Sequence, residues 1–243
     1  MDAASTTPPT KAMVRAWDLP TRVFHWTLVM LVAVSWASFQ YAQLIGDPRL
    51  VIHRRTGYAV LILVAWRLLW GFAGSSTSRF TSFVRGPGAA IGYASALARG
   101  QSRHYLGHNP LGALMVLALL ALVGGQALLG LFTVEHNDLA AGPLYRLVDE
   151  ETQKLASRWH RRAIYWFLLP AIGLHITANV LYALLRKDPL IAAMVTGRKP
   201  AARYEDEAEA QIVVRPVLRA LGCLVAAAAI VLGGILLLGG RLT

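Results

Sequence analysis

Four histidines lie in or at the ends of long apolar segments of the chain: His25, His53, His160 and His175. An imidazole is costly in such surroundings unless it binds something. His160 and His175 share one apolar segment and are fifteen positions apart, which is about 22 Å along an α-helix. Fifteen steps of about 100° also leave the two side chains within about 60° of one direction. One helix can therefore present two ligands at two depths, each to a histidine on another helix.

The composition indicates a membrane protein. Hydrophobic residues make up 56% of the chain and charged residues 15%, and the mean hydropathy is +0.47. A bilayer core of about 30 Å needs about 20 apolar residues per helix. We therefore expect an all-α integral membrane protein, in which four transmembrane helices form a bundle and a fifth C-terminal helix follows. The apolar runs lie at 23–45, 52–74, 110–134, 161–185 and 217–240.

These runs divide the chain into a leader at 1–22, a four-helix domain at 23–190, a polar linker at 191–216 and a fifth helix at 217–243. No A-x-A-like cleavage site follows the first run, so we expect an uncleaved signal-anchor helix. The segment at 135–159 is expected to hold either a short amphipathic helix lying on the bilayer or a solvated loop.

The distribution of charge predicts an orientation. The net charge of +11 reflects lysines and arginines that anchor a membrane protein to anionic lipid, and we give nucleic acid almost no weight as a partner. Segment 75–109 contains arginines and no acidic residue, whereas segment 135–159 holds several acidic residues. The bias favours a multi-pass protein of the bacterial inner membrane with a cytoplasmic N-terminus.

In this orientation the histidines fall into two pairs of equal depth. His25 and His175 lie towards the cytoplasm, and His53 and His160 lie towards the periplasm. Each pair bridges two helices, which is the arrangement that ligates haem b in a four-helix bundle. Zinc or copper would need three or four ligands at one depth. The single Cys223 excludes a covalent Cys-x-x-Cys-His haem and a thiolate cluster, so the sequence predicts two non-covalent haems that transfer electrons.

Several arginines lie close to the presumed haem edges, where a guanidinium can pair with a propionate. We assign this role to Arg22, Arg54 and Arg158, with interfacial anchoring as the alternative. Arg67 lies deep in the second run. Its charge must pair with another group, snorkel to the surface or face a cofactor.

Two further histidines are weaker candidates for a quinone site. His108 precedes the third run and could line a quinone pocket, although helix capping by Asn109 and Pro110 explains the segment more simply. His136 follows the third run and is either a rim residue of a quinol-oxidising site or an ordinary loop residue.

Four segments resemble the bacterial cytochrome b561 family, which includes the b-type cytochrome subunits of nickel–iron hydrogenases. They are VRAWDLPTRVFHW, HRRTGYAVLILVAWRLLWGF, GHNPLGALMVLALLALVGGQALLGLF and WHRRAIYWFLLPAIGLH, in the family's order over residues 12–190. The family pattern places haem-ligating histidines at the positions of His25, His53, His160 and His175. Family members commonly have one residue fewer between the last two, and we expect Pro170 to kink the helix and restore the ligand direction.

The resemblance implies an electron-transfer subunit of an oxidoreductase, which passes electrons between membrane quinone and a periplasmic c-type cytochrome, hydrogenase or other dehydrogenase module. Two alternatives are kept. One is a self-contained superoxide:quinone-type oxidoreductase, and the other is a non-redox membrane anchor whose histidines bind nothing.

Overall fold

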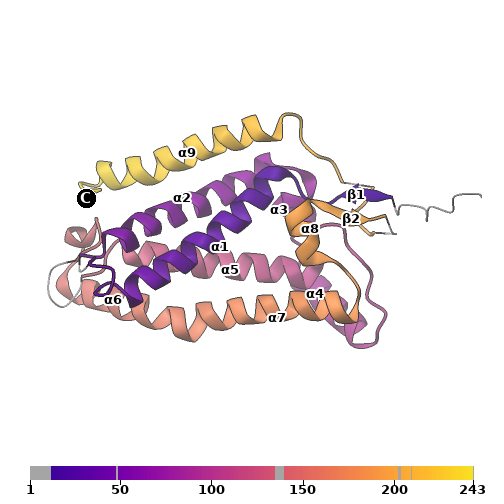
Figure 1. Cartoon of the computed structure of the whole chain (residues 1–243), viewed down its shortest axis with the longest axis horizontal. Helices are drawn as coiled ribbons and strands as arrows, with labels where there is room; N and C mark the ends of the chain where they lie inside the picture. Colours follow the sequence, from indigo (N-terminus) through magenta and orange to yellow (C-terminus); the bar gives the residue numbers. More distant parts are fainter. Residues whose placement is uncertain (1–11, 48, 135–139, 202–203, 209, 243) are drawn as a thin grey trace, which may run out of the picture.

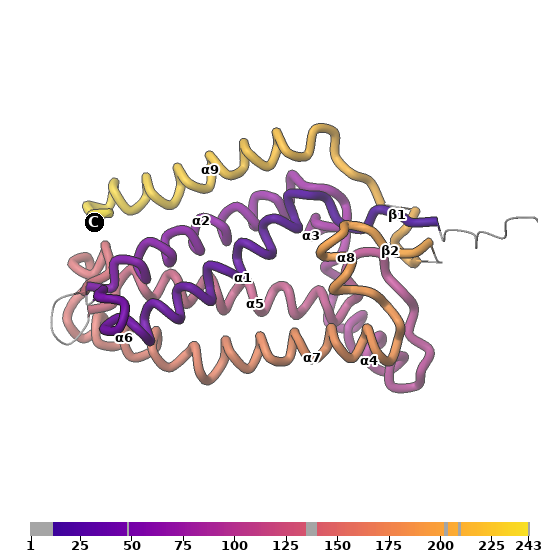
Figure 2. The backbone as a smooth tube through the Cα atoms, viewed as in Figure 1, coloured from indigo at the N-terminus to yellow at the C-terminus, as the bar shows by residue number. Residues whose placement is uncertain are grey.

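The computed structural model describes residues 12–47, 49–134, 140–201, 204–208 and 210–242. His136 lies outside the described residues. Long helices laid side by side form most of the molecule (Figure 1), and the chain passes from end to end of the bundle between them (Figure 2). Within the described residues, five helical stretches are long and apolar enough to span a membrane, which confirms the predicted all-α membrane fold. They are α1 (Leu19–Gln40), α2 (Val51–Ala73), α5 (Pro110–Gly130), the helix from Glu150 to Leu185, and α9 (Pro216–Leu237).

Side-chain caps set the start of three of these helices. The carboxylate of Asp18 accepts a hydrogen bond from the Thr21 N–H at α1, and the side-chain oxygen of Asn109 accepts one from the Gly112 N–H at α5. Asp149 caps the fourth long helix by accepting from the Thr152 N–H. Each cap satisfies a backbone donor that has no partner within its helix.

The fourth long helix begins well before its apolar run. It consists of α6 (Glu150–Ala163), a π-helical turn η3 (Ile164–Leu168) and α7 (Leu169–Leu185) in direct succession. A short 3₁₀ helix, η2 (Tyr145–Leu147), precedes it. A helix therefore forms at residues 150–159, as one of the two alternatives predicted, but it is not a separate element, because it continues directly into the transmembrane helix.

The π-helical turn lies between the two histidines of this helix. The Leu169 N–H donates to the carbonyl of Ile164, five residues back, where an α-helix uses the fourth. Pro170 follows directly and supplies no N–H to the carbonyl four residues before it. One π turn takes up one extra residue, so His160 and His175 are separated by the equivalent of about fourteen α-helical steps, close to four full turns. The π turn beside Pro170 thus restores the direction of the second histidine.

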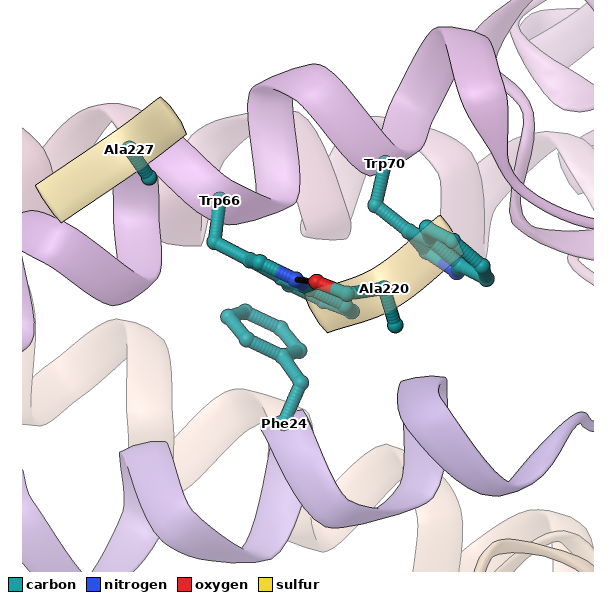
Figure 3. Packing of buried hydrophobic residues seen from close by; sticks show 5 residues of the cluster. All are labelled: Phe24, Trp66, Trp70, Ala220 and Ala227. Atoms are coloured by element: carbon teal, nitrogen blue, oxygen red, sulfur yellow. Dashed lines mark hydrogen bonds between the residues drawn. The ribbon is translucent and has the colours of Figure 1, made fainter. Parts of the chain in front are cut away.

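Packing places α2 at the centre of the molecule. It contacts α1, α5 and α9, while α5 contacts α6 and α7. The ring of Phe24 stacks on Trp66 at 5.1 Å between centroids, and Trp66 stacks on Trp70 at 5.4 Å (Figure 3). The indole N–H of Trp66 donates to the backbone carbonyl of Ala220, 2.9 Å away. This aromatic cluster fastens α9 along the outer side of α2 (Figure 1).

The outward surface of the long helices is apolar. Trp166 is 74% exposed, Leu185 75% and Val225 71%. Large apolar side chains gathered on an outer surface mark contact with lipid or another apolar partner. The bilayer supplies that partner along these helices.

Short elements close the end of the bundle where α1 begins. They include a two-stranded antiparallel sheet, in which β1 (Met13–Arg15) pairs with β2 (Arg198–Pro200). Part of the predicted linker at 191–216 is therefore folded against the N-terminal segment. The other elements here are η1 (Ser76–Ser78), α3 (Phe80–Phe83), α4 (Pro87–Ala98) and α8 (Leu190–Thr196).

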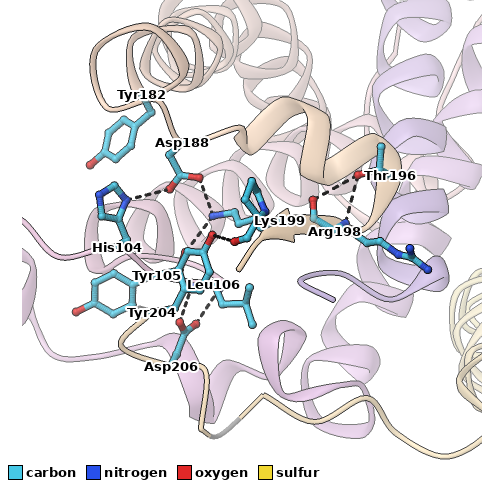
Figure 4. A network of polar contacts seen from close by, with 12 residues as sticks. His104, Tyr105, Leu106, Tyr182, Asp188, Thr196, Arg198, Lys199, Tyr204 and Asp206 are labelled. Atoms are coloured by element: carbon cyan, nitrogen blue, oxygen red, sulfur yellow. Dashed lines mark hydrogen bonds and ion pairs between the residues drawn. The ribbon is translucent and has the colours of Figure 1, made fainter. Parts of the chain in front are cut away.

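A buried ion pair holds these short elements together. Lys199 is fully buried, and its ammonium lies 3.0 Å from the carboxylate of Asp188 and donates to the Tyr105 carbonyl at 3.0 Å (Figure 4). Asp206 accepts hydrogen bonds from the backbone N–H groups of Leu106 and Gly107. A buried ammonium is tolerated because it is both ion-paired and hydrogen-bonded. The contacts join the segment after α7 to the segment before α5.

Candidate haem-binding sites

The structure brings the four histidines together as two pairs, each formed between two helices. The rings of His25 on α1 and His175 on α7 lie 6.4 Å apart between centroids. The rings of His53 on α2 and His160 on α6 lie 5.9 Å apart. Because α1 and α2 run antiparallel and each carries its histidine near its start, the two pairs lie towards opposite ends of the bundle.

The separation within each pair fits two ligands on opposite sides of one metal ion. Metal–imidazole bonds of about 2 Å place two such rings about 6 Å apart between centroids. Among the residues that the structure describes, no group of three or more His, Cys, Asp or Glu side chains converges as a metal site would require. Two imidazoles at this separation suit a planar cofactor that supplies the remaining ligands of its own metal.

Hydrogen bonds orient both rings of the His53/His160 pair. Nδ1 of His53 lies 2.8 Å from the backbone carbonyl of Ser35, and Nδ1 of His160 lies 2.9 Å from that of Gln126. The side-chain amide of Gln126 in turn donates to the His160 carbonyl. A carbonyl holds the proton on Nδ1 and leaves Nε2 as the ligand nitrogen, which is the usual arrangement of metal-binding histidines.

The second pair has different neighbours. Nδ1 of His25 is buried and has no hydrogen-bond partner. Nδ1 of His175 lies 3.4 Å from the amide nitrogen of Asn179, one turn further along α7. That amide nitrogen donates to the His175 carbonyl at 2.7 Å.

A cavity of about 200 Å³ adjoins the His53/His160 pair, much larger than the voids of a packed interior. Gly57, one turn after His53, lines it, and a Cβ at this position would meet no atom within 4 Å. A Cβ at Gly130 would stand 3.1 Å from Cε1 of His160. Glycines at these two positions therefore leave room for a bulky group and for the ligand ring.

Four buried polar atoms on residues that line this cavity have no hydrogen-bond partner in the part of the chain that the structure describes. They belong to side chains that line the cavity: Nε1 of Trp36, Nε of Arg54, the hydroxyl of Tyr58 and Oε1 of Gln126. Three of the four, on Trp36, Arg54 and Tyr58, are donors, and unpaired buried donors are costly, so their grouping in one cavity points to a ligand that accepts hydrogen bonds. The carboxylates of haem are such acceptors, and the residues present fit the group.

The three arginines assigned to propionates occupy different places. Arg54 lines the cavity of the His53/His160 pair. Arg22 donates to the carbonyl of Thr196 and so holds α8 against α1. Arg158 is exposed, whereas Arg161 on the same helix lines the cavity. The position of Arg161 next to His160 in the sequence could have indicated its role, because adjacent helical residues lie at nearly the same depth in the membrane.

The weaker sequence candidates lie at the other end of the bundle. Arg67 is 3% exposed and does not snorkel; its guanidinium lies 4.8 Å from the ring centroid of Phe80. His108 packs against Trp17 and Phe83, with ring centroids at 4.8 and 4.5 Å. Asn109 caps α5, as the simpler interpretation of this segment predicted.

Comparison with known protein families shows which family the chain belongs to. A model of the family described as prokaryotic cytochrome b561 matches residues 16–197, which include all four histidines. The chain belongs to this family. Its function is therefore that of a b-type cytochrome, which binds haem b and transfers electrons in a membrane. The matched region ends before α9. A search of curated proteins finds no match.

Proposed function

We propose that the protein is a di-haem cytochrome b that carries electrons across the bacterial inner membrane between quinone and a periplasmic redox partner. The observation that carries the proposal is the presence of two histidine pairs towards opposite ends of one bundle, each with ring centroids about 6 Å apart. The His160-to-His175 helix contributes one ligand to each pair and holds the two sites at a constant separation.

The residues assigned to each site hold the cofactor and set its chemistry. His53 and His160 would hold one haem, and His25 and His175 would hold the other, with two imidazoles as the protein ligands at each site. When bound, haem b supplies a one-electron couple of its iron. Arg54 and Arg161 face the cavity of the first site, where their guanidinium groups suit propionate carboxylates. Because two histidines would bind the iron at each site, both sites suit electron transfer rather than oxygen binding.

Apolar residues keep water out of the space between the two pairs. Val60 and Val64 of α2 pack with Val123 of α5 and Leu168 of η3. These positions lie between the paired histidines along their helices. The layer prevents ions and water from crossing the bundle, while an electron needs no continuous polar path.

The charge distribution and the family support the choice of partners. The arginine-rich 75–109 segment lies at the His25/His175 end and is assigned to the cytoplasm. The opposite end then faces the periplasm, where a c-type cytochrome, hydrogenase or other dehydrogenase subunit meets the His53/His160 site. Quinone exchanges electrons from within the bilayer, as the family resemblance implies.

Haem analysis of the purified protein tests the proposal. We expect a b-type reduced-minus-oxidised absorbance spectrum and two non-covalent haems per chain. A short-chain quinol added in detergent should make these bands appear, and a chemical oxidant such as ferricyanide should then remove them. A protein that retains its fold but binds no haem would instead be a membrane anchor.

A further inference from the structure

The two histidine pairs differ in what their Nδ1 atoms contact. At the His53/His160 pair, both Nδ1 atoms face backbone carbonyls, at 2.8 and 2.9 Å. A carbonyl oxygen only accepts, so both rings donate an Nδ1–H. Such donation increases the basicity of the ligating nitrogen on the other side of the ring.

At the His25/His175 pair, neither ring has such an acceptor among the residues that the structure describes. His25 Nδ1 has no partner, and His175 Nδ1 has the amide nitrogen of Asn179 as its neighbour. The orientation of this amide is set by its 2.7 Å hydrogen bond to the His175 carbonyl, because the reverse orientation would bring two oxygens together. An amide nitrogen donates and does not accept, so Asn179 offers nothing to an Nδ1–H.

More basic axial ligands stabilise ferric over ferrous iron, and hydrogen bonding around the ligands is one of the means by which a protein sets a haem potential. We propose that the haem at the His53/His160 site has the lower reduction potential of the two. Asn179 then acts as a positioning residue: it presents no hydrogen-bond acceptor to the Nδ1–H of His175, and this keeps the reduction potential of the His25/His175 site high. This inference rests on the proposed di-haem function and adds to it the direction in which electrons pass between the two sites.

The direction follows from the order of the two potentials. One electron leaves the His53/His160 site and one arrives at the His25/His175 site, with no bond formed or broken and with the Nδ1 protons in place. Without a membrane potential this step is downhill. Electrons that enter from the periplasmic partner therefore collect at the site assigned to the cytoplasmic side.

Asn179→Asp tests the role of Asn179 directly. The introduced carboxylate has no donor for the His175 carbonyl, so we expect it to turn away from that oxygen and give His175 Nδ1–H a strong acceptor one turn away. In a spectroscopic redox titration of the haem-loaded protein, we expect the ferric-to-ferrous equilibrium of the His25/His175 site to shift at least tenfold towards ferric, which is a fall of 59 mV for one electron. The matched control is Asn179→Leu, which removes the amide without adding an acceptor. It should change the ferric-to-ferrous equilibrium of this site less than threefold.

Assignment of the two sites uses His25→Ala, which should leave only the His53/His160 haem. The remaining haem should titrate at the lower of the two wild-type potentials. If it titrates at the higher one, or if Asn179→Asp retains two haems with both potentials unchanged, the inference is overturned. A wild-type protein with fewer than two haems would refute the proposed function, and the inference with it.

A second variant covers a failure of Asn179→Asp to fold. In Gly130→Ala the new Cβ would stand 3.1 Å from Cε1 of His160, so the ring must shift and its hydrogen bond to the Gln126 carbonyl should weaken. We expect the potential of the His53/His160 site to rise and its low-temperature electron paramagnetic resonance signal to shift, with the other site unchanged. A change confined to the His25/His175 site would contradict the inference.

Discussion

In the proposed di-haem protein, each histidine of a pair supplies one of only two protein ligands to its site, so the loss of either should have the same effect. We predict that His25→Ala and His175→Ala each remove one haem, and that His53→Ala and His160→Ala each remove the other. Haem content should fall from two to about one per chain in every single variant.

Pyridine haemochrome analysis measures this content, and the difference spectrum identifies which component is lost. His104→Ala is the matched control, since this partly exposed histidine lies away from both pairs and should leave two haems. Loss of the same spectral component in His25→Ala and His53→Ala would show that the pairing is wrong.

His108 is a buried histidine outside the pairs, and it predicts a pH dependence. Burial, followed by the charges of Arg67 and Lys199, lowers the pKa of His108 to about 3. Because the unfolded residue titrates near 6.5, the unfolded chain binds one more proton here between about pH 6.5 and pH 3. The folded state therefore loses stability as the pH falls through this window, and keeps it above pH 6.5.

His108→Phe should remove this contribution while keeping the contacts with Trp17 and Phe83. Between pH 7 and pH 5, the loss of unfolding free energy should be smaller than in the wild type by up to about 2 kcal/mol. Thermal unfolding in detergent at the two pH values measures the difference. An identical pH dependence in both proteins would mean that folding does not change the pKa of His108.

At the scale of the element, the π turn at Ile164–Leu168 sets the relation between the two ligands of one helix. If the turn absorbs one extra residue, its removal together with that residue should leave both ligands in register. We predict that deletion of Trp166, combined with Pro170→Ala to permit a regular α-helix, retains two haems. Trp166 suits the deletion because it is 74% exposed on the outer surface.

Insertion of one alanine after Trp166 is the opposite change. It should rotate the later part of the helix by about 100° relative to the earlier part, and at least one haem should be lost. Haem content and the helical circular dichroism signal separate this outcome from unfolding. Equal haem content in the deletion and the insertion would show that the helix adjusts elsewhere.

At the scale of the whole molecule, the assigned orientation decides which haem meets the periplasm. Ser78 in the 75–109 segment is buried and hydrogen-bonded to Thr21, so it is unsuited to labelling, whereas Gln101 in the same segment is exposed. In a Cys223→Ala background, we predict that Gln101→Cys resists an impermeant thiol reagent added to intact cells. Glu151→Cys, at the exposed start of α6, should react.

Permeabilised cells supply the control, because both cysteines should react once the membrane is open. Reaction of Gln101→Cys but not Glu151→Cys in intact cells would invert the protein. The His53/His160 site would then face the cytoplasm, and the proposed contact with a periplasmic partner would fail.

Hydropathy along the chain was sufficient to predict the membrane helices, and helix position was sufficient to predict which histidines meet. Both depend on local properties: the length needed to cross a bilayer and the rise of 1.5 Å per helical residue. The cap at Asn109 is equally local, because a side chain there reaches a backbone N–H of its own helix.

Tertiary structure alone decided the contacts between segments that are distant in sequence. The carbonyls that orient His53 and His160 belong to α1 and α5, and the buried partner of Lys199 lies before α8. The choice of Arg161 over Arg158 as a cavity residue likewise depends on how α6 is rotated against its neighbours. Such contacts are set by helix rotation and packing, which hydropathy does not encode, because many rotations bury a similar apolar surface.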